Sequence, residues 1–203
     1  MAQDRSLDYE EKIRHLLAAV RDGDPDAFAA LIEEVGQELR KLSAYWRRRQ
    51  FREAHTLQTT ALVNEVVLRL LRSLKRSKEA FPQSRLHFIS LAAQMMRWTL
   101  VDYARKPREQ PLDDPTATLI GWSRIELDTV LIFDQALRRL EEAQGEIGKR
   151  RARAVELHVL GGMTHREIAE QLCISDDAAR RDCQIGLTQI REALRGKAQS
   201  AGR

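Results

Sequence analysis

The chain has 203 residues, 43% of them hydrophobic and 32% charged, and a formal net charge of +4 at pH 7. This length allows one large or two small domains with packed cores, and the modest positive charge permits a nucleic-acid partner without requiring one. Because no apolar run reaches the length of a membrane span and the N-terminus lacks the apolar core of a signal peptide, we expect a cytoplasmic protein without a membrane partner.

Two helices are expected at the start of the chain. Residues 9–20 carry apolar side chains at helical spacing, with Ile13 and Leu17 on one side. Asp24 followed by Pro25 is typical of a second helix start, because aspartate caps the first turn and proline fits the first helical position. That helix ends in a basic run that is either a solvated face or a phosphate contact. The run comprises Arg40, Lys41, Arg47, Arg48, Arg49 and Arg52.

A long amphipathic helix is expected over residues 59–74. Val63, Val67 and Leu70 form an apolar seam at helical spacing, while polar and charged side chains occupy the other face. The following segment, residues 75–87, loses this periodicity and combines four cations with a proline and an aromatic residue. It is either a surface loop or a basic loop that receives an unstacked nucleic-acid base.

Residues 88–105 are apolar on nearly every side of the helix that they predict. This pattern is typical of the central helix of a small bundle, in which Met95 and Met96 would fill the core. Residues 106–124 contain three prolines and lack periodicity, so we interpret them as a linker between domains.

Helical patterning returns in the second half of the chain, first over residues 125–142. Residues 145–151 combine two glycines with basic side chains and predict a turn. Residues 154–160 resume the helical pattern and run into a pair of glycines, which is a typical helix stop.

Residues 163–195 predict two helices joined by a tight turn. Thr164 and Glu167 have the spacing of a capping box, and Ser175 is placed to cap the second helix. The outer face of that second helix contains Asp177, Arg180, Arg181, Gln184, Thr188 and Arg191. This arrangement is typical of a helix-turn-helix, whose second helix enters the DNA major groove, and it also fits an ordinary helical hairpin with a solvated charged face.

Taken together, these patterns predict an all-α fold, because no segment alternates as a β-strand does. We expect two small helical domains joined by a flexible linker, with a helix-turn-helix in the C-terminal one. The expected domains span residues 1–105 and 125–196, the linker spans residues 106–124, and residues 197–203 form a polar tail.

The sequence carries few signs of metal, thiol or catalytic chemistry. Cys173 and Cys183 fall on inward-facing helix positions without a C-x-x-C spacing, so we expect buried, reduced thiols. The five histidines show no paired ligand spacing. We find neither a phosphate-binding glycine loop nor a nucleophile next to a base, and therefore expect no metal, no cofactor and no enzymatic activity.

Four segments, in chain order, resemble motifs of the extracytoplasmic-function (ECF) sigma factors of bacterial RNA polymerase, the minimal two-domain members of the sigma-70 family. Residues 23–31 resemble the motif G-D-x-x-A-F-x-x-L, and residues 61–69 resemble D-L-V-Q-E-V-F-L-R. Residues 91–105 are similar to the promoter-recognising helix. Residues 156–175 resemble E-L-x-x-x-G-G-x-x-x-x-E-I-A-E-x-L-G-I-S. The resemblance therefore covers nearly the whole chain.

The resemblance implies that the first domain is sigma region 2, which binds core RNA polymerase and the −10 promoter element. The outer face of the 59–74 helix would contact the clamp of the largest subunit through Asn64, Glu65, Arg69 and Arg72. The 75–87 loop would hold a flipped base, so that DNA melting is driven by base capture without covalent chemistry. The implied −10 contacts are Lys78, Phe81, Gln83, Ser84, Arg85, Gln94, Arg97 and Trp98.

The same resemblance implies that the second domain is sigma region 4, which reads the −35 promoter element. Arginine forms two hydrogen bonds to guanine and glutamine forms two to adenine, which suits side chains on the outer face of the second helix. The implied −35 contacts are Arg180, Arg181, Gln184, Thr188 and Arg191. The basic cluster at residues 149–153 would bind phosphates.

Two residues of the helix-turn-helix depart from the family pattern. Cys173 stands where the turn usually has glycine, so a left-handed backbone there would carry a steric cost. Ala179 stands where a larger aliphatic residue is common, which predicts a lightly packed core.

A third departure concerns the polymerase-binding helix. The family usually has an acidic D-A-E-D run at its start, and the aligned residues here are Gln58, Thr59, Thr60 and Ala61. Either this chain uses other contacts, or phosphorylation of Thr59 or Thr60 by a Ser/Thr kinase supplies the missing negative charge.

The expected partners are core RNA polymerase and promoter DNA, with a Ser/Thr kinase or an anti-sigma factor as regulator. Two alternatives stay open. The first alternative to a sigma factor is a stand-alone helix-turn-helix regulator that binds duplex DNA without polymerase. The second is an adaptor that binds polymerase without promoter contact.

Overall fold

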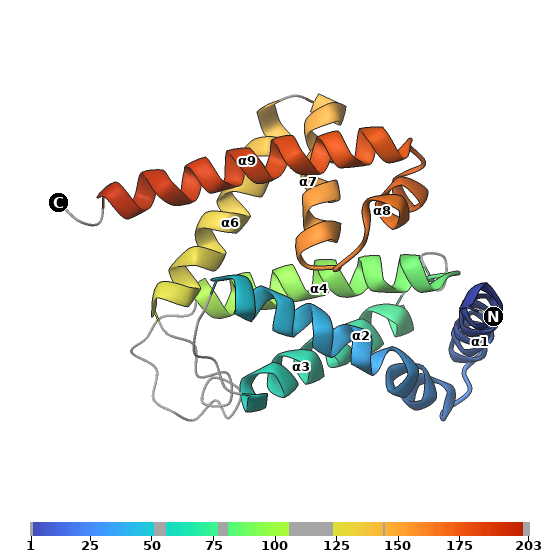
Figure 1. Cartoon of the computed structure of the whole chain (residues 1–203). Coiled ribbons are helices and arrows are strands. Elements are labelled where there is room, and N and C mark those ends of the chain that lie inside the picture. Colours follow the sequence, from blue (N-terminus) through green and yellow to red (C-terminus); the bar gives the residue numbers. More distant parts are fainter. Residues whose placement is uncertain (1, 51–55, 77–80, 106–123, 144, 201–203) are drawn as a thin grey trace, which may run out of the picture.

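The computed structural model describes residues 2–50, 56–76, 81–105, 124–143 and 145–200 (Figure 1). All regular secondary structure within these ranges is α-helical, which confirms the expected all-α fold. The helices lie in two layers that meet along one central helix (Figure 1).

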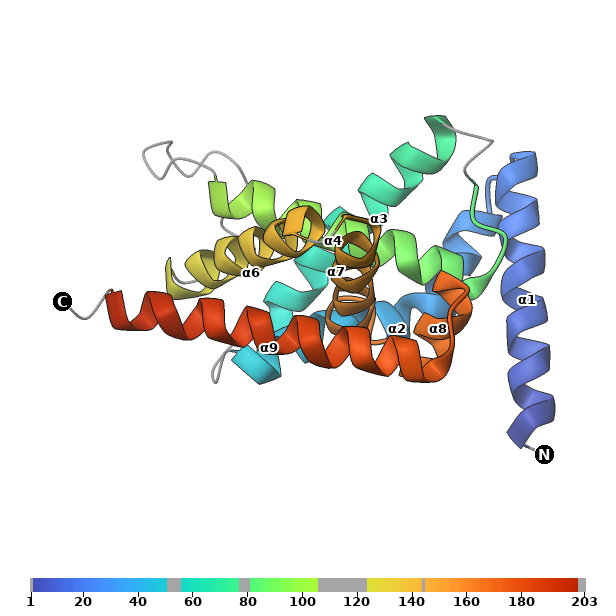
Figure 2. The same cartoon turned by 90° about the horizontal axis from the view of Figure 1, so that it is seen from above.

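The first layer and the central helix come from the N-terminal half of the chain. The helices are α1 (Ala2–Asp22), α2 (Ala27–Gln50), α3 (Thr56–Arg76) and the central α4 (Arg85–Arg105). Helix α2 packs against α1 and α3, and α3 packs in turn against α4. Figure 2 shows α1 standing at one edge of the molecule.

The second layer comes from the C-terminal half. It contains α6 (Arg124–Ala143), α7 (Gly145–Val159), α8 (His165–Leu172) and α9 (Asp176–Ser200). Helix α7 packs against α6, α8 and α9, and α9 also packs against α6 and α8. The long α9 lies on the side of this layer that is remote from α4 (Figure 1).

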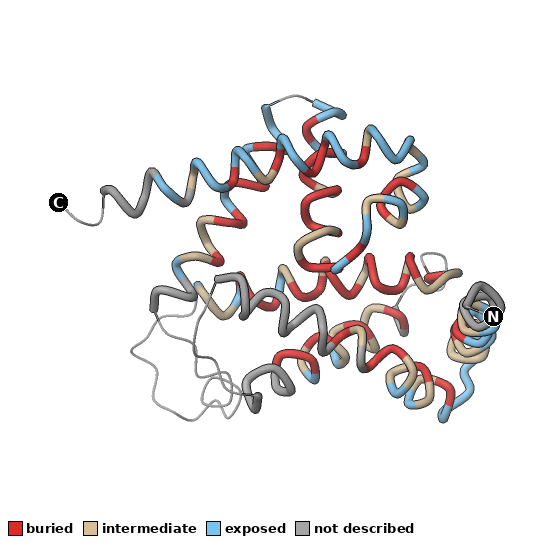
Figure 3. The backbone as a smooth tube through the Cα atoms, viewed as in Figure 1, coloured by how far each residue is buried: buried red, intermediate tan, exposed pale blue. Residues whose placement is uncertain are grey.

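Helix α4 is the central helix that its apolar pattern predicts. It contacts α1 and α3 in one layer and α6, α7 and α8 in the other. Phe88 and Met96 are fully buried and Met95 is nearly so, which confirms both methionines as core residues. Figure 3 shows buried residues along much of this central helix. Buried apolar side chains from both layers form one cluster. The division into two domains stays a prediction, and residues 106–123 of the expected linker lie outside the described residues.

The helix starts that the sequence predicts are capped as expected. The backbone N–H groups of Asp26 and Ala27 donate to Asp24 Oδ1, at 2.9 and 3.3 Å. Thr164 and Glu167 form a complete capping box at the start of α8. Ser175 Oγ accepts the N–H of Ala178 at 3.3 Å at the start of α9. These side chains satisfy backbone donors that have no partner within the helix.

The turn predicted over residues 145–151 is wrong, because these residues form the first half of α7. Gly145, with φ of +55°, provides the break after α6. Gly148 instead lies inside the helix, where α7 approaches α6 so closely that a Cβ would lie 2.1 Å from the Leu140 carbonyl oxygen. This glycine is therefore explained by packing between two helices and not by a turn.

Candidate nucleic-acid and polymerase interfaces

The turn between α8 and α9 has the left-handed residue that the family pattern suggests. Cys173 has φ of 54° and ψ of 46°, and its backbone N–H donates to the Glu170 carbonyl at 3.3 Å. A residue with a Cβ is strained there by roughly 1–2 kcal/mol. The prediction that both cysteines are buried is wrong for Cys173, which is exposed because it sits at the turn, and right for Cys183.

Helix α9 has one buried and one exposed face. Ala179, Cys183 and Ile190 are buried against the rest of the second layer. Gly186 lies so close to α7 that a Cβ would be 2.4 Å from Val155 Cγ2. The glycine at position 186 therefore lets α9 approach α7 closely, and the light core packing expected at Ala179 stays a prediction.

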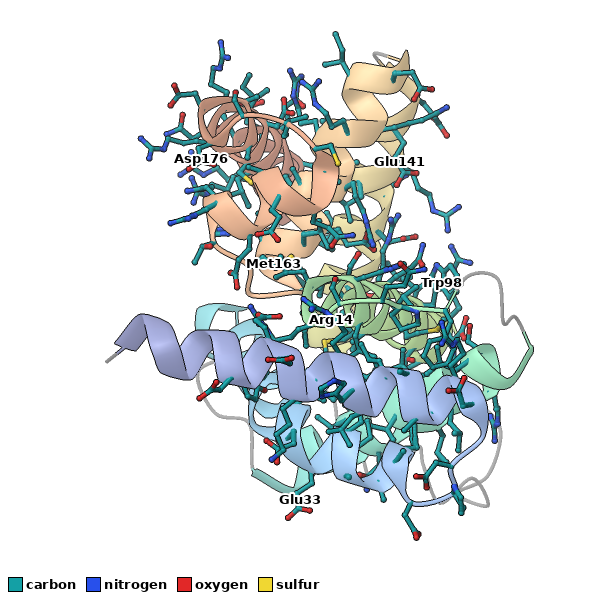
Figure 4. All side chains as sticks on the ribbon, turned by 90° about the vertical axis from the view of Figure 1, so that its right-hand side faces the viewer. Arg14, Glu33, Trp98, Glu141, Met163 and Asp176 are labelled. Carbon is teal, nitrogen blue, oxygen red and sulfur yellow. The ribbon has the colours of Figure 1, made fainter. Side chains whose placement is uncertain are left out.

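The exposed face of α9 carries every residue that the sequence predicts for the −35 element. Arg180, Arg181, Gln184, Thr188 and Arg191 are all exposed. Two of them contact the helix backbone: Arg181 Nε donates to the Asp177 carbonyl at 3.3 Å, and the Thr188 hydroxyl donates to the Gln184 carbonyl at 2.9 Å. Figure 4 looks towards the Asp176 end of this helix, where polar side chains extend outward.

The basic cluster at residues 149–153 connects helices instead of forming a patch of unpaired charge. Arg150 Nε donates to Asp182 Oδ2 on α9 at 2.7 Å, and Arg151 Nε lies 3.5 Å from Asp182 Oδ1. Arg153 donates to the backbone carbonyl of Ser90 on α4 at 3.2 Å. Arg150, Arg151 and Arg153 thus join α7 to α9 and to α4, whereas Lys149 is exposed, and the phosphate-binding role expected for the cluster stays a prediction.

The outer face of α3 carries the candidate polymerase contacts. Asn64 and Arg72 are exposed, whereas Glu65 and Arg69 are half-buried. Arg69 donates to Glu65 Oε1 at 3.0 Å and to Asp102 Oδ2 of α4 at 2.6 Å. Burial lowers the pKa of Arg69, but hydrogen bonds to Asp102 and Glu65 outweigh it and raise the pKa above its usual value.

Sequence reasoning missed one residue of this face, Leu68, whose exposed fraction is 46%. It lies one helical turn from both Asn64 and Arg72, so the three side chains form an exposed stripe along α3. The signal that could have identified it is an aliphatic residue that falls outside the apolar seam. Thr59 and Thr60 lie near the start of α3, and their side chains are outside the described residues.

The candidate −10 residues are distributed over the approach to α4 and α4 itself. Phe81 is buried and lines a pocket of about 560 Å³ beside the turn between α1 and α2. Gln83 is exposed, and Ser84 Oγ accepts the N–H of His87 at 3.1 Å, which starts α4. Arg85 is thus the first residue of a helix, not part of a loop. Lys78 lies outside the described residues.

Three further −10 candidates lie on α4. Trp98 is exposed by 48% and Gln94 is half-buried. Arg97 is different, because its side chain is only 12% exposed and its guanidinium contacts carboxylates of the second layer. Its Nε donates to Asp134 Oδ1 at 2.8 Å, and its Nη1 donates to Glu141 Oε1 at 3.1 Å. Burial lowers the pKa of Arg97, but these carboxylates and Glu156 outweigh it and raise the pKa.

Arg85 is held in a similar way. Its side chain is 16% exposed and pairs with Glu10 of α1, Glu38 of α2 and Glu167 of α8. The distance from Arg85 Nη2 to Glu167 Oε1 is 2.8 Å. Burial lowers the pKa of Arg85, and the hydrogen bonds to Glu10 and Glu167 raise it by more.

The described residues contain neither a bilayer-spanning helix nor a cluster of metal-binding side chains. No helix among them is both long enough and apolar enough to span a bilayer. They also contain no group of three or more histidine, cysteine, aspartate or glutamate side chains placed to bind a metal ion.

The family model of the ECF sigma factors matches residues 10–196. No curated protein and no solved structure matches the chain. The family match covers, in whole or in part, every helix that the structure describes, from α1 to α9. The chain therefore belongs to the ECF sigma factor family, whose members are regulatory proteins that bind core RNA polymerase and promoter DNA.

Proposed function

We propose that this chain directs promoter-specific transcription initiation by reading a −35 element with the exposed face of α9 and a −10 element with α4 and the segment before it. The observation that supports the proposal most strongly is the set of side chains exposed on α9. Its first turns present two arginines and a glutamine to solvent on a helix with a capped N-terminus. Arginine and glutamine can discriminate guanine and adenine by paired hydrogen bonds in the major groove.

The polymerase-binding surface is the outer face of α3, in this proposal. Asn64, Leu68 and Arg72 provide an exposed stripe, and the Arg69 pairs with Glu65 and Asp102 fix that face against α4. The exposed side chain of Leu68 adds apolar area to this face that a bound partner would bury. Residues 1–105 and 125–196 then act as the two functional units, with residues 106–124 as the linker and residues 197–203 as a tail.

The proposal includes a regulatory step at the start of α3. No acidic residue lies in the first turn of this helix. A phosphate on Thr59 or Thr60 would add roughly 1.5 to 2 negative charges near the positive end of the helix dipole. A Ser/Thr kinase would then activate the protein. The competing explanation is that this chain binds polymerase through other contacts, with an anti-sigma factor as the regulator.

The decisive experiment is selection from a promoter library with randomised upstream and downstream elements, using bacterial core polymerase with and without the chain. We expect the holoenzyme to enrich two separated motifs. The Arg180→Ala/Gln184→Ala variant should lose enrichment at the upstream motif and keep it at the downstream one. Arg139→Ala is the matched control, because Arg139 is an exposed arginine on α6, outside every candidate interface.

Two outcomes would reject this proposal. Enrichment of one duplex motif by the chain alone, unchanged by core polymerase, would favour the stand-alone helix-turn-helix regulator. Core binding without any enriched motif, and without an effect of the double variant, would favour an adaptor that does not contact promoters.

A further inference from the structure

The two layers of the molecule are joined by ion pairs that involve candidate DNA contacts. All the carboxylates that pair with Arg97 in the described ranges come from the second layer: Asp134 and Glu141 from α6 and Glu156 from α7. Arg85 reaches Glu167 at the start of α8. In Figure 4, Glu141 lies in the second layer above Trp98, on the same side of the molecule.

The charged groups at this interface are buried enough for their ion pairs to resist screening by solvent and salt. The side chain of Asp134 is 5% exposed, and it also lies 2.9 Å from Arg138 and 3.6 Å from Arg105. Partly buried charge pairs are screened less by salt than surface pairs are. Separating the layers would leave the guanidinium of Arg97 without these partners, unless another anion replaced them.

A carboxylate and a DNA phosphate are interchangeable partners for a guanidinium, because both accept paired, charge-assisted hydrogen bonds. The closed arrangement therefore gives Arg97 and Arg85 the type of partner that DNA would supply. The face of α9 differs, because Arg180, Gln184 and Arg191 are exposed in the same arrangement. One candidate DNA surface is covered and the other is open.

We propose that the second layer is an autoinhibitory cover for α4, closed by an ionic latch in which Asp134 and Glu141 hold Arg97 and Glu167 holds Arg85. In the closed chain Arg97 cannot contact DNA, and the latch must open before α4 can bind a −10 element. Arg85 loses one of its three carboxylates on opening and keeps Glu10 and Glu38 of its own layer. The closed state follows from the ion pairs alone, while its effect on DNA binding rests on the proposed function.

The latch is tested in the whole chain with Glu141→Gln and Glu167→Gln combined. Glutamine keeps the size of both side chains and also serves in a capping box, so α8 should stay folded. The matched control is Glu146→Gln, because Glu146 is exposed and pairs with Lys149 on its own helix.

Opening is measured by hydrogen–deuterium exchange of the α4 peptides and by the radius of gyration in small-angle scattering. We expect exchange in α4 to be about fivefold faster in the double variant, the change expected from losing partly exposed ion pairs. The radius of gyration should rise, and high salt should have the same effect on the wild type. Equal exchange and equal radius in wild type, control and double variant would overturn the proposal.

Masking is measured by binding to a fluorescent single-stranded DNA of random sequence. The double variant should bind roughly fivefold more tightly than wild type, and adding Arg97→Gln should remove that gain. An opened α4 without a gain in affinity would overturn the inhibitory role. Failure of the proposed function looks different: neither the closed nor the opened chain would bind core polymerase, whatever the DNA affinity.

Discussion

At the scale of single residues, the turn between α8 and α9 combines a left-handed backbone with a side chain that disfavours it. Cys173 has φ of 54°, and it is the only described residue other than glycine with a positive φ. Its side chain is exposed, so it gains no core packing in return. The strain at this turn therefore lowers the stability of the fold without an evident structural benefit.

We expect Cys173→Gly to raise the free energy of unfolding by about 0.5–1 kcal/mol, because relief of the left-handed strain exceeds the added entropy of glycine in the unfolded chain. Urea denaturation measures the effect. Cys173→Ala is the matched control: it keeps the Cβ and the strain, and it should change stability by less than about 0.5 kcal/mol. Equal stabilisation by alanine and glycine would mean that backbone strain is not the cause.

Thr59 and Thr60 carry the second prediction at this scale. We expect Thr59→Glu or Thr60→Glu to bind core polymerase about three- to tenfold more tightly than wild type, because a negative charge is restored near the start of α3. Thr59→Gln and Thr60→Gln have the same size without the charge and should leave the affinity unchanged. Equilibrium binding to purified core enzyme measures this. Tight wild-type binding that glutamate does not improve would show that polymerase binding needs no added charge.

At the scale of elements, the sequence predicted features that depend on neighbouring residues and missed those that depend on contacts between helices. Helix starts were predictable because Asp24, Thr164 and Ser175 cap backbone groups only two or three residues away. The role of Gly148 was not predictable, because its constraint is a carbonyl of another helix. For the same reason the partners of Arg97 could not be predicted, since they lie 37 and 44 residues along the chain.

The exposed stripe of α3 gives a prediction for that element. We expect Leu68→Ala to weaken binding to core polymerase by roughly fivefold or more, because an exposed leucine within a binding surface contributes apolar contact area. Ile147→Ala on α7 is the matched control, since Ile147 is similarly exposed and lies outside the stripe. Thermal unfolding should be unchanged in both variants. Equal core binding by wild type and Leu68→Ala would place the polymerase contact elsewhere.

At the scale of the whole molecule, the two layers share one apolar cluster and are also joined by ion pairs. We expect a single cooperative unfolding transition at low salt, because neither layer separates from the other without exposing α4. High salt should weaken the ion pairs and broaden or split that transition. Differential scanning calorimetry measures both. Two separate transitions at low salt would show that the layers are thermodynamically independent.

Glu167 belongs to two structures at once: it completes the capping box of α8 with Thr164, and it pairs with Arg85 of α4. Any ligand that draws Arg85 away changes the charge balance at the start of the helix that leads into α9. Linkage then requires reciprocity, so that binding at α9 and binding at α4 change each other's affinity by the same factor. Under the proposed function, this one carboxylate couples DNA binding at α4 to DNA binding at α9 before the chain binds core polymerase.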